Sequence, residues 1–206
     1  MGKPFQIRLI FFYCFLFAGL LFSTISCNSS NETLPNAPSS EGSSLAEDSL
    51  VYRIIIDDEI NPSVSRLVRR GIEEAQKREA DYLFIELETY GGLVVDADDI
   101  RTDILNCPIP VIIYIQNNAA SAGALISLAC DSIYMNPSAT IGAAAVVDQT
   151  GEVQAEKYQS YMRGKMRATA EANGRNPAIA EGMVDPSIVV PGISDSSKII
   201  TLTAQE

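Results

Sequence analysis

Residues 110–129 read PVIIYIQNNAASAGALISLA and decide the fold of this chain. The first seven residues are almost all apolar, which is typical of a strand that is covered on both faces. Residues 117–120 then predict a turn, and Ser121 opens a helix of small residues that runs to Cys130. The stretch is therefore a strand, a turn and a helix, with a serine where the helix begins.

The alternation of strand and helix continues on both sides of this stretch. Asn61-Pro62 is typical of a helix start, with asparagine as the N-cap and proline in the first turn. Short connections between alternating elements predict an α/β fold with a largely parallel sheet flanked by helices. The other strands are expected over residues 51–57, 82–87, 132–135 and 198–203. The other helices are expected from residue 62, over residues 94–105 and 156–173, and from Pro177. The apolar face of the helix from residue 62 is formed by Val64, Leu67, Val68, Ile72 and Ala75.

Composition excludes several classes of site and partner. The chain has 206 residues, enough for one ordinary domain, and its formal charge of −11 argues against nucleic acid as a partner. It contains no histidine, so a Ser-His-Asp triad, a Cys-His pair and a histidine-ligated zinc site are excluded. Cys107 and Cys130 are interpreted as small core residues at helix ends, without a disulfide. Any catalysis must use another base, and no metal or organic cofactor is implied.

Residues 1–27 are typical of a targeting segment. A positive start precedes an uncharged apolar run over residues 9–22, and small residues then lead to Cys27. This pattern predicts either a secretory signal, with Cys27 as the lipidated residue of a loose lipobox, or an uncleaved N-terminal anchor. Residues 28–49, which are rich in serine, asparagine, glutamate and proline, are expected to form a disordered linker. Residues 50–206 should therefore lie outside the cytoplasm, tethered to a membrane through the N-terminus.

Two features indicate a site for acyl-transfer chemistry. Ser121 has the strand-turn-helix setting of a nucleophile elbow, and the N–H of Ala122 would point toward a bound carbonyl oxygen. The alternative for Ser121 is an ordinary helix N-cap. Gly91-Gly92 follows a strand, where glycines let a substrate approach closely and offer N–H groups to an oxyanion, and the alternative there is a tight turn.

A serine without histidine needs another base, and lysine is one of the possibilities. Lys157 is the best candidate, because it lies on the first turn of a predicted helix beside Tyr158. Lys165 stands between two arginines in a stretch that is expected to be charged and exposed. The alternative for each lysine is an ordinary surface residue. The four lysines that follow the targeting segment are Lys77 at a solvated helix end, Lys157, Lys165, and Lys198 at a strand start.

Three ordered motifs resemble the NfeD family of membrane-bound proteases, which are ClpP-class serine proteases with a Ser-Lys dyad. The motifs are residues 88–92 (ETYGG), 119–124 (AASAGA) and 136–144 (NPSATIGAA). The resemblance covers residues 51–206 and implies a ClpP/crotonase-like fold. Two positions depart from the family pattern: Tyr90 replaces a proline before the glycines, and Ala145-Val146 replace a His-Pro pair.

The resemblance also implies roles for particular residues. The family serine before Ala-Gly falls on Ser121 as the nucleophile. The oxyanion donors fall on Gly92 and Ala122, with Gly91 beside the substrate. The family lysine lies on the helix before a Gly-Arg-Asn turn, and counting back from residues 174–176 places it at Lys157.

The leading hypothesis is an exported, membrane-tethered serine endopeptidase that needs no cofactor. The resemblance implies that its substrates are apolar segments of membrane-associated proteins, with stomatin-like proteins as partners, and that it forms at least a dimer. Longer family members carry transmembrane helices and a small β-barrel domain, so a chain that stops at Glu206 is expected to be a truncated protease domain. Three alternatives stay open: a catalytically silent binding module for a membrane protein, a signal peptide peptidase A-like protease, and an acyl-CoA enzyme of the related crotonase fold.

Overall fold

The computed structural model describes residues 49–206, except residues 149 and 196. The predictions for residues 1–27 and for lipidation at Cys27 lie outside the described residues, and so does the predicted linker over residues 28–49 except for its last residue. The elements are β1 (Val51–Asp57), α1 (Pro62–Lys77), β2 (Tyr82–Thr89), α2 (Val94–Leu105), β3 (Val111–Ala120), α3 (Ala122–Ala129), β4 (Ser132–Met135), β5 (Thr140–Gly142), α4 (Glu156–Ala172), α5 (Pro177–Gly182) and β6 (Thr201–Thr203).

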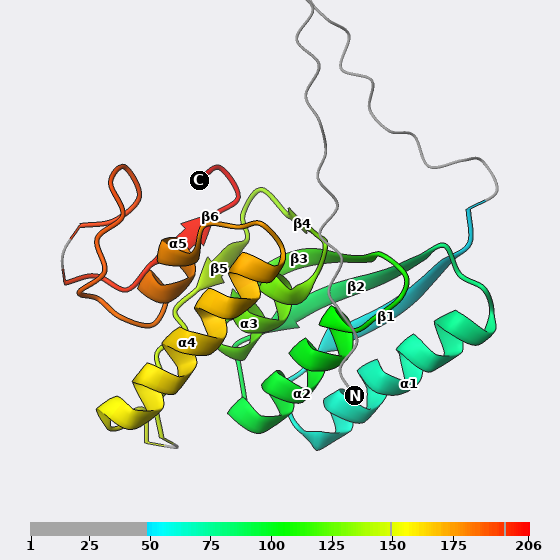
Figure 1. The fold of residues 1–206 in the computed structure, drawn as a ribbon, viewed down its shortest axis with the longest axis horizontal. Coiled ribbons are helices and arrows are strands. Elements are labelled where there is room, and N and C mark those ends of the chain that lie inside the picture. Colours follow the sequence, from blue (N-terminus) through cyan, green and yellow to red (C-terminus); the bar gives the residue numbers. More distant parts are fainter. Residues whose placement is uncertain (1–48, 149, 196) are drawn as a thin grey trace, which may run out of the picture. The chain divides into compact units, whose positions relative to one another are not determined.

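The sheet is largely parallel, with the strand order β1-β2-β3-β5-β6. β4 pairs with the first half of β3 and β5 with its second half, both parallel, whereas β6 runs antiparallel to β5. The helices α1, α2 and α4 lie on the same side of this sheet (Figure 1). The predicted α/β fold with a largely parallel sheet flanked by helices is confirmed. All carboxyl ends of β1, β2 and β3 point to the same edge, where parallel sheets usually carry their sites.

Local sequence explains the start of α1 and the face that it buries. The side chain of Asn61 accepts hydrogen bonds from the backbone N–H groups of Ser63 (2.8 Å) and Val64 (3.1 Å), as expected of an N-cap. The apolar residues Val64, Val68, Ile72 and Ala75 are buried as predicted. Leu67 was predicted on the same face, but its side chain is 46% exposed, because it lies at the border of the apolar stripe.

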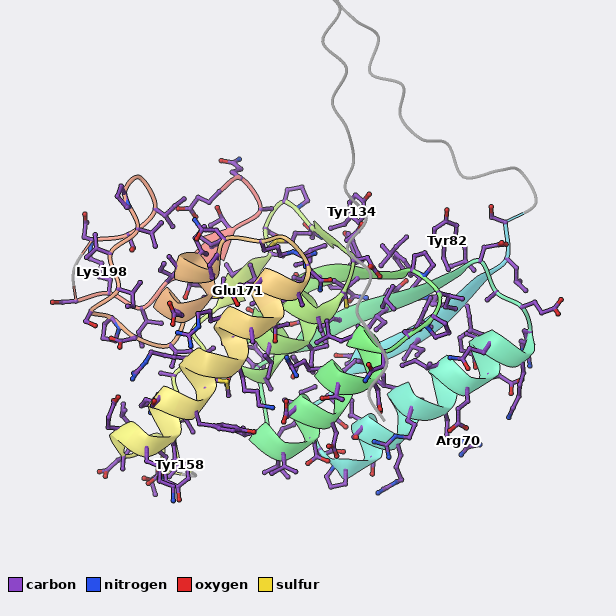
Figure 2. The ribbon with its side chains drawn as sticks, in the orientation of Figure 1. Arg70, Tyr82, Tyr134, Tyr158, Glu171 and Lys198 are labelled. Carbon is purple, nitrogen blue, oxygen red and sulfur yellow. The ribbon has the colours of Figure 1, made fainter. Side chains whose placement is uncertain are left out.

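The core lies between the sheet and the helices on one of its faces. Alternate residues of β2 and β3 point into it and are fully buried, whereas their neighbours Phe84, Ile112 and Tyr114 are only partly buried. Tyr82 and Tyr134 project from the side of the sheet opposite to Arg70 of α1 (Figure 2). The prediction that β3 is covered on both faces is therefore wrong within the described residues. A run of apolar residues indicates a strand, but it does not reveal how many layers cover it.

The structure also differs from the expected elements near the site. Residues 117–120, predicted as a turn, continue β3, since Asn118, Ala119 and Ala120 pair with β5. β5 itself was not predicted, because a strand of three residues has too short a pattern to show a period. The last strand begins at Thr201 rather than at Lys198. Cys130 is fully buried as predicted, whereas Cys107 is only partly buried, and both are free thiols.

No helix in the described part of the chain is long and apolar enough to cross a membrane. Over the same residues, no group of three or more acidic or cysteine side chains is arranged to hold a metal ion.

Candidate active site

Ser121 occupies a strained junction between β3 and α3. Its backbone has φ 54° and ψ −113°, a conformation that residues with a side chain rarely adopt. Its N–H donates to the carbonyl of Gly142 in β5 at 2.9 Å, and its side chain makes no capping hydrogen bond to α3. The reading of Ser121 as an ordinary N-cap is therefore wrong. A strained serine on a strand-to-helix turn is instead the geometry of a nucleophile elbow.

The helix α3 behind Ser121 is buried along its whole length. A Cβ at Gly123 would lie 2.7 Å from Cγ2 of Thr89 in β2, so only glycine lets the first turn of α3 approach the sheet this closely. Ala122, the first residue of α3, donates its N–H to no acceptor among the described residues. The positive end of the helix thus offers free donors beside the serine, Ala122 among them.

The turn Gly91-Gly92 lies directly against Ser121. A Cβ at Gly91 would be 2.8 Å from Cβ and 3.2 Å from Oγ of Ser121. The N–H of Gly91 donates to Oγ1 of Thr89 (3.1 Å), so this N–H already has an acceptor within the turn. The turn is held from the other side by Ile60, whose N–H donates to the carbonyl of Gly91 (2.7 Å).

Gly92 differs from Gly91 in what its backbone can offer. Its φ is 149°, and a Cβ there would collide with the backbone of Ile60. The N–H of Gly92 donates to no acceptor among residues 49–206, leaving aside the undescribed 149 and 196. The free backbone donors of the site therefore include Gly92 and Ala122, the two residues that the sequence predicted as oxyanion donors.

Glu88 is a residue of the site that sequence analysis did not single out. Its carboxylate accepts hydrogen bonds from the N–H of Asn117 (2.7 Å), the N–H of Asn118 (3.2 Å) and the side-chain amide of Asn118 (2.9 Å). Burial raises the pKa of Glu88, but the hydrogen bonds from both asparagines outweigh it and the net pKa is lowered. Glu88 thus fixes the end of β3 that leads to Ser121. No local pattern could have shown a contact across 30 residues.

A cavity of about 350 Å³ opens beside the two glycines. Its walls carry four carboxylates, those of Asp57, Asp58, Glu59 and Glu88. Tyr90 lines the same cavity and is 80% exposed. The carboxylates make the approach to the glycine turn strongly acidic.

Lys157 lies on the first turn of α4, on the protein surface. Its ammonium group is 5.4 Å from the ring centroid of Tyr158, and it has no hydrogen bond to Ser121. Tyr158 marks the end of α4 that extends away from the rest of the helix layer (Figure 2). The structure thus brings together Ser121, Gly91, Gly92 and Ala122, but it does not place Lys157 in contact with them.

Lys165 has different surroundings from those predicted. It is half-buried, and its ammonium group donates to Asp98 of α2 at 2.8 Å, close to Tyr161. The expectation of an exposed, charged stretch was wrong here, because Asp98 comes from a distant part of the chain. The hydrogen bond to Asp98 raises the pKa of Lys165. A lysine held protonated in this way is a poor general base, which leaves Lys157 as the better candidate on α4.

Gln159 holds the segment that leads to Lys157, and sequence analysis missed it as well. Its side chain is buried; its amide donates to the carbonyls of Val146 (2.7 Å) and Gln154 (3.2 Å) and its oxygen accepts from the N–H of Val146 (3.0 Å). Val147 and Val153 form a bridge in the same segment, and both are at least half exposed. Gln159 therefore ties a surface hairpin to the first turns of α4.

Comparison with known proteins identifies the family. A family model described as the NfeD1b N-terminal domain matches residues 50–206. The chain belongs to this family. It is 35% identical over 162 residues to the membrane protein NfeD1b of Bacillus subtilis, covering 78% of this chain and 37% of that protein. It is 32% identical over 143 residues to the membrane-bound protease PH1510 of Pyrococcus horikoshii, covering 66% of this chain and 32% of that protein.

This NfeD1b-family chain thus spans about a third of the length of both curated relatives. Among solved structures it is similar to a serine-to-alanine mutant of 1510-N, a membrane-bound stomatin-specific protease, with a TM-score of 0.67, 30% identity and coverage of 79% of this chain and 76% of that one. A lysine-to-alanine mutant of 1510-N in complex with a substrate peptide also has a TM-score of 0.67, with 28% identity and coverage of 78% and 71%. ClpP1 from Listeria monocytogenes, at 21% identity, coverage of 75% and 84% and a TM-score of 0.57, shows the shared ClpP-like fold.

Proposed function

We propose that residues 50–206 are a serine endopeptidase domain in which Ser121 is the nucleophile and Lys157 the general base. The observation that carries this proposal is the strained Ser121 beside two unpaired backbone donors, Gly92 and Ala122. Acyl transfer needs such a nucleophile next to donors for the oxyanion. The protease relatives support it, since the solved 1510-N mutants replace one serine and one lysine.

The reaction would proceed in two displacements. Lys157 takes the proton of the Ser121 hydroxyl while Oγ bonds to the peptide carbonyl carbon. The N–H groups of Gly92 and Ala122 stabilise the oxyanion, which then collapses as the C–N bond breaks and the amine leaves with the proton from Lys157. Water hydrolyses the resulting ester by the reverse sequence.

Lys157 must reach Oγ of Ser121 for this chemistry, at about 3 Å. A lysine accepts a proton only in its neutral form, which removal from water favours. The part of the sequence around Lys157 exposes much apolar surface, on Val147, Val153 and Tyr158. An apolar peptide bound over these side chains would exclude water from Lys157, and this fits apolar segments of membrane-associated proteins as substrates.

The cellular setting is part of the same proposal. Residues 1–27 tether the domain to a membrane as a lipidated signal with Cys27 or as an uncleaved anchor, and residues 28–49 act as the linker. The domain works as an oligomer on the extracytoplasmic side. The membrane protein and the stomatin-specific protease among the relatives support membrane-associated, stomatin-like substrates.

The test is cleavage of a library of apolar peptides by the full chain in a non-ionic detergent. Ser121→Ala and Lys157→Ala should each lower the cleavage rate by more than about 10³-fold without changing the melting temperature. Lys198→Ala is the matched control, since that side chain is exposed and forms an ion pair only with Asp195 among the described residues. Retained cleavage in the Ser121→Ala protein contradicts the assignment.

A second candidate function is a catalytically silent binding module for a membrane protein. Among the described residues Lys157 makes no hydrogen bond to Ser121, and its ammonium group lies over the ring of Tyr158 instead, which favours this function. Labelling of Ser121 by a fluorophosphonate, abolished in Ser121→Ala and slowed in Lys157→Ala, distinguishes the two, because a silent module would not activate its serine.

A further inference from the structure

The outer edge of β1 has no partner strand among the described residues. β1 stands at one end of the sheet order and pairs only with β2 over Val51–Asp57. An edge strand presents a row of backbone N–H and C=O groups that can pair with another extended chain. This edge is therefore a site where an added strand can bind.

A groove of about 920 Å³ runs between this edge and α1. Its apolar walls include Ile55, which is 49% exposed, and Leu67, which is 46% exposed. Gly71 of α1 lies against the side chain of Ile54, where a Cβ would collide with it. The groove has room for the side chains of a chain laid along β1.

The groove is basic in an acidic protein. Five basic residues and two glutamates line it, a net formal charge of 5 − 2 = +3, whereas the whole chain carries −11. Two of the five basic residues already have carboxylate partners, because Arg53 pairs with Glu86 (2.6 Å) and Arg78 with Glu74 (2.8 Å). Within the described residues the other three, Arg66, Arg70 and Lys77, form no ion pair, although the charges of Lys77 and Arg70 help to lower the pKa of Glu74.

We propose that the groove between β1 and α1 binds an extended, acidic segment of a partner protein. The segment adds a strand to the edge of β1, and its carboxylates face Arg66, Arg70 and Lys77. The charge of the groove selects this occupant, and the open strand edge requires it to be extended. A lipid headgroup would use the charges but not the strand edge. The proposal does not depend on the proposed protease chemistry.

The probe is a fluorescent ten-residue peptide of alternating valine and glutamate. It is titrated into the full chain in non-ionic detergent micelles. The chain and all its variants carry Ser121→Ala, so that the probe cannot be cleaved. We expect saturable binding that weakens about tenfold in Arg70→Glu, because the reversed charge removes an attraction and adds a repulsion. Lys198→Glu, an equal charge change at another exposed lysine, should bind as tightly as the parent protein.

Two altered probes separate strand addition from simple charge attraction. N-methylation of alternate amides removes donors that pair with an edge strand and should abolish binding, and replacement of glutamate by lysine should do the same. Several results would overturn the proposal: no saturable binding, equal binding of either altered probe, or equal weakening by Lys198→Glu. Two further outcomes would overturn it. If Arg70→Glu weakens only the binding of the chain to micelles doped with phosphatidylglycerol, the groove binds a membrane surface. If it weakens only self-association of the chain, the groove binds a second copy.

Discussion

The serine and lysine parts of the candidate site have opposite surroundings. Ser121 lies between a sheet strand and a fully buried helix, and Gly91 fits against it without room for a Cβ. Lys157 stands on an exposed helix turn next to a surface hairpin. The backbone donors are thus held by packing against the core, whereas the base stands on an exposed part of α4. Mutations should separate these two parts by their effects on stability and on cleavage.

Gly92→Ala should give the largest effect. The new Cβ would collide with the backbone of Ile60, and φ 149° is unfavourable for alanine, so we expect a loss of about 2–4 kcal/mol in the free energy of unfolding. Displacement of its N–H should also lower cleavage by about 10²-fold or more. Urea unfolding and a peptide-cleavage assay measure the two effects.

Gly164→Ala is the matched control on the lysine side. Gly164 lies inside α4, and no atom beyond its chain neighbours and the backbone of its own helix lies within 4 Å of the position of its missing Cβ. Alanine should therefore stabilise the protein by about 0.5–1 kcal/mol through helix propensity. If both substitutions destabilise equally, the contrast between a rigid serine part and a tolerant lysine helix is wrong.

Gln159→Leu should have an intermediate effect, concentrated on the lysine part. It removes three hydrogen bonds and leaves the partly buried N–H of Val146 without its partner, which costs about 1–3 kcal/mol. Because the hairpin would no longer be tied to α4, kcat for peptide cleavage should fall and its pH profile should change, while KM stays the same. Gln116→Leu, which loses one hydrogen bond to Glu86 on β2, is the control and should leave the pH profile unchanged.

The serine part could be predicted from sequence because its signals are local. An apolar run, a serine and a series of small residues follow one another at Ser121, and the paired glycines directly follow β2. The contacts that fix the site are not local: Glu88 and Asn118 are 30 residues apart, Gln159 and Val146 are 13 apart, and Lys165 and Asp98 are 67 apart. Such hydrogen bonds leave no periodic pattern. This is why the surroundings of Lys165 were predicted incorrectly.

Glu88→Gln should have the smallest destabilising effect, and one that depends on pH. The lowered pKa of Glu88 means that its hydrogen bonds stabilise the folded protein when the carboxylate is ionised. That stability is present above the ordinary glutamate pKa of about 4.3 and is lost as the pH falls through the lower pKa of the folded state. At pH 7 the variant should lose about 1 kcal/mol, since its amide can accept through only one oxygen.

Urea unfolding of both proteins between pH 7 and pH 3 measures this difference. The difference in the free energy of unfolding between wild type and Glu88→Gln should narrow below about pH 4.3, because the wild-type carboxyl then takes up a proton and also loses its charge. Asp81→Asn is a suitable comparison, since Asp81 accepts one N–H, from Leu50, at the far end of the β1-β2 pair. If cleavage falls with stability in Glu88→Gln but not in Asp81→Asn, the end of β3 positions Ser121 through Glu88. A difference in the free energy of unfolding that stays constant with pH would mean that the charge of Glu88 does not hold the serine part in place.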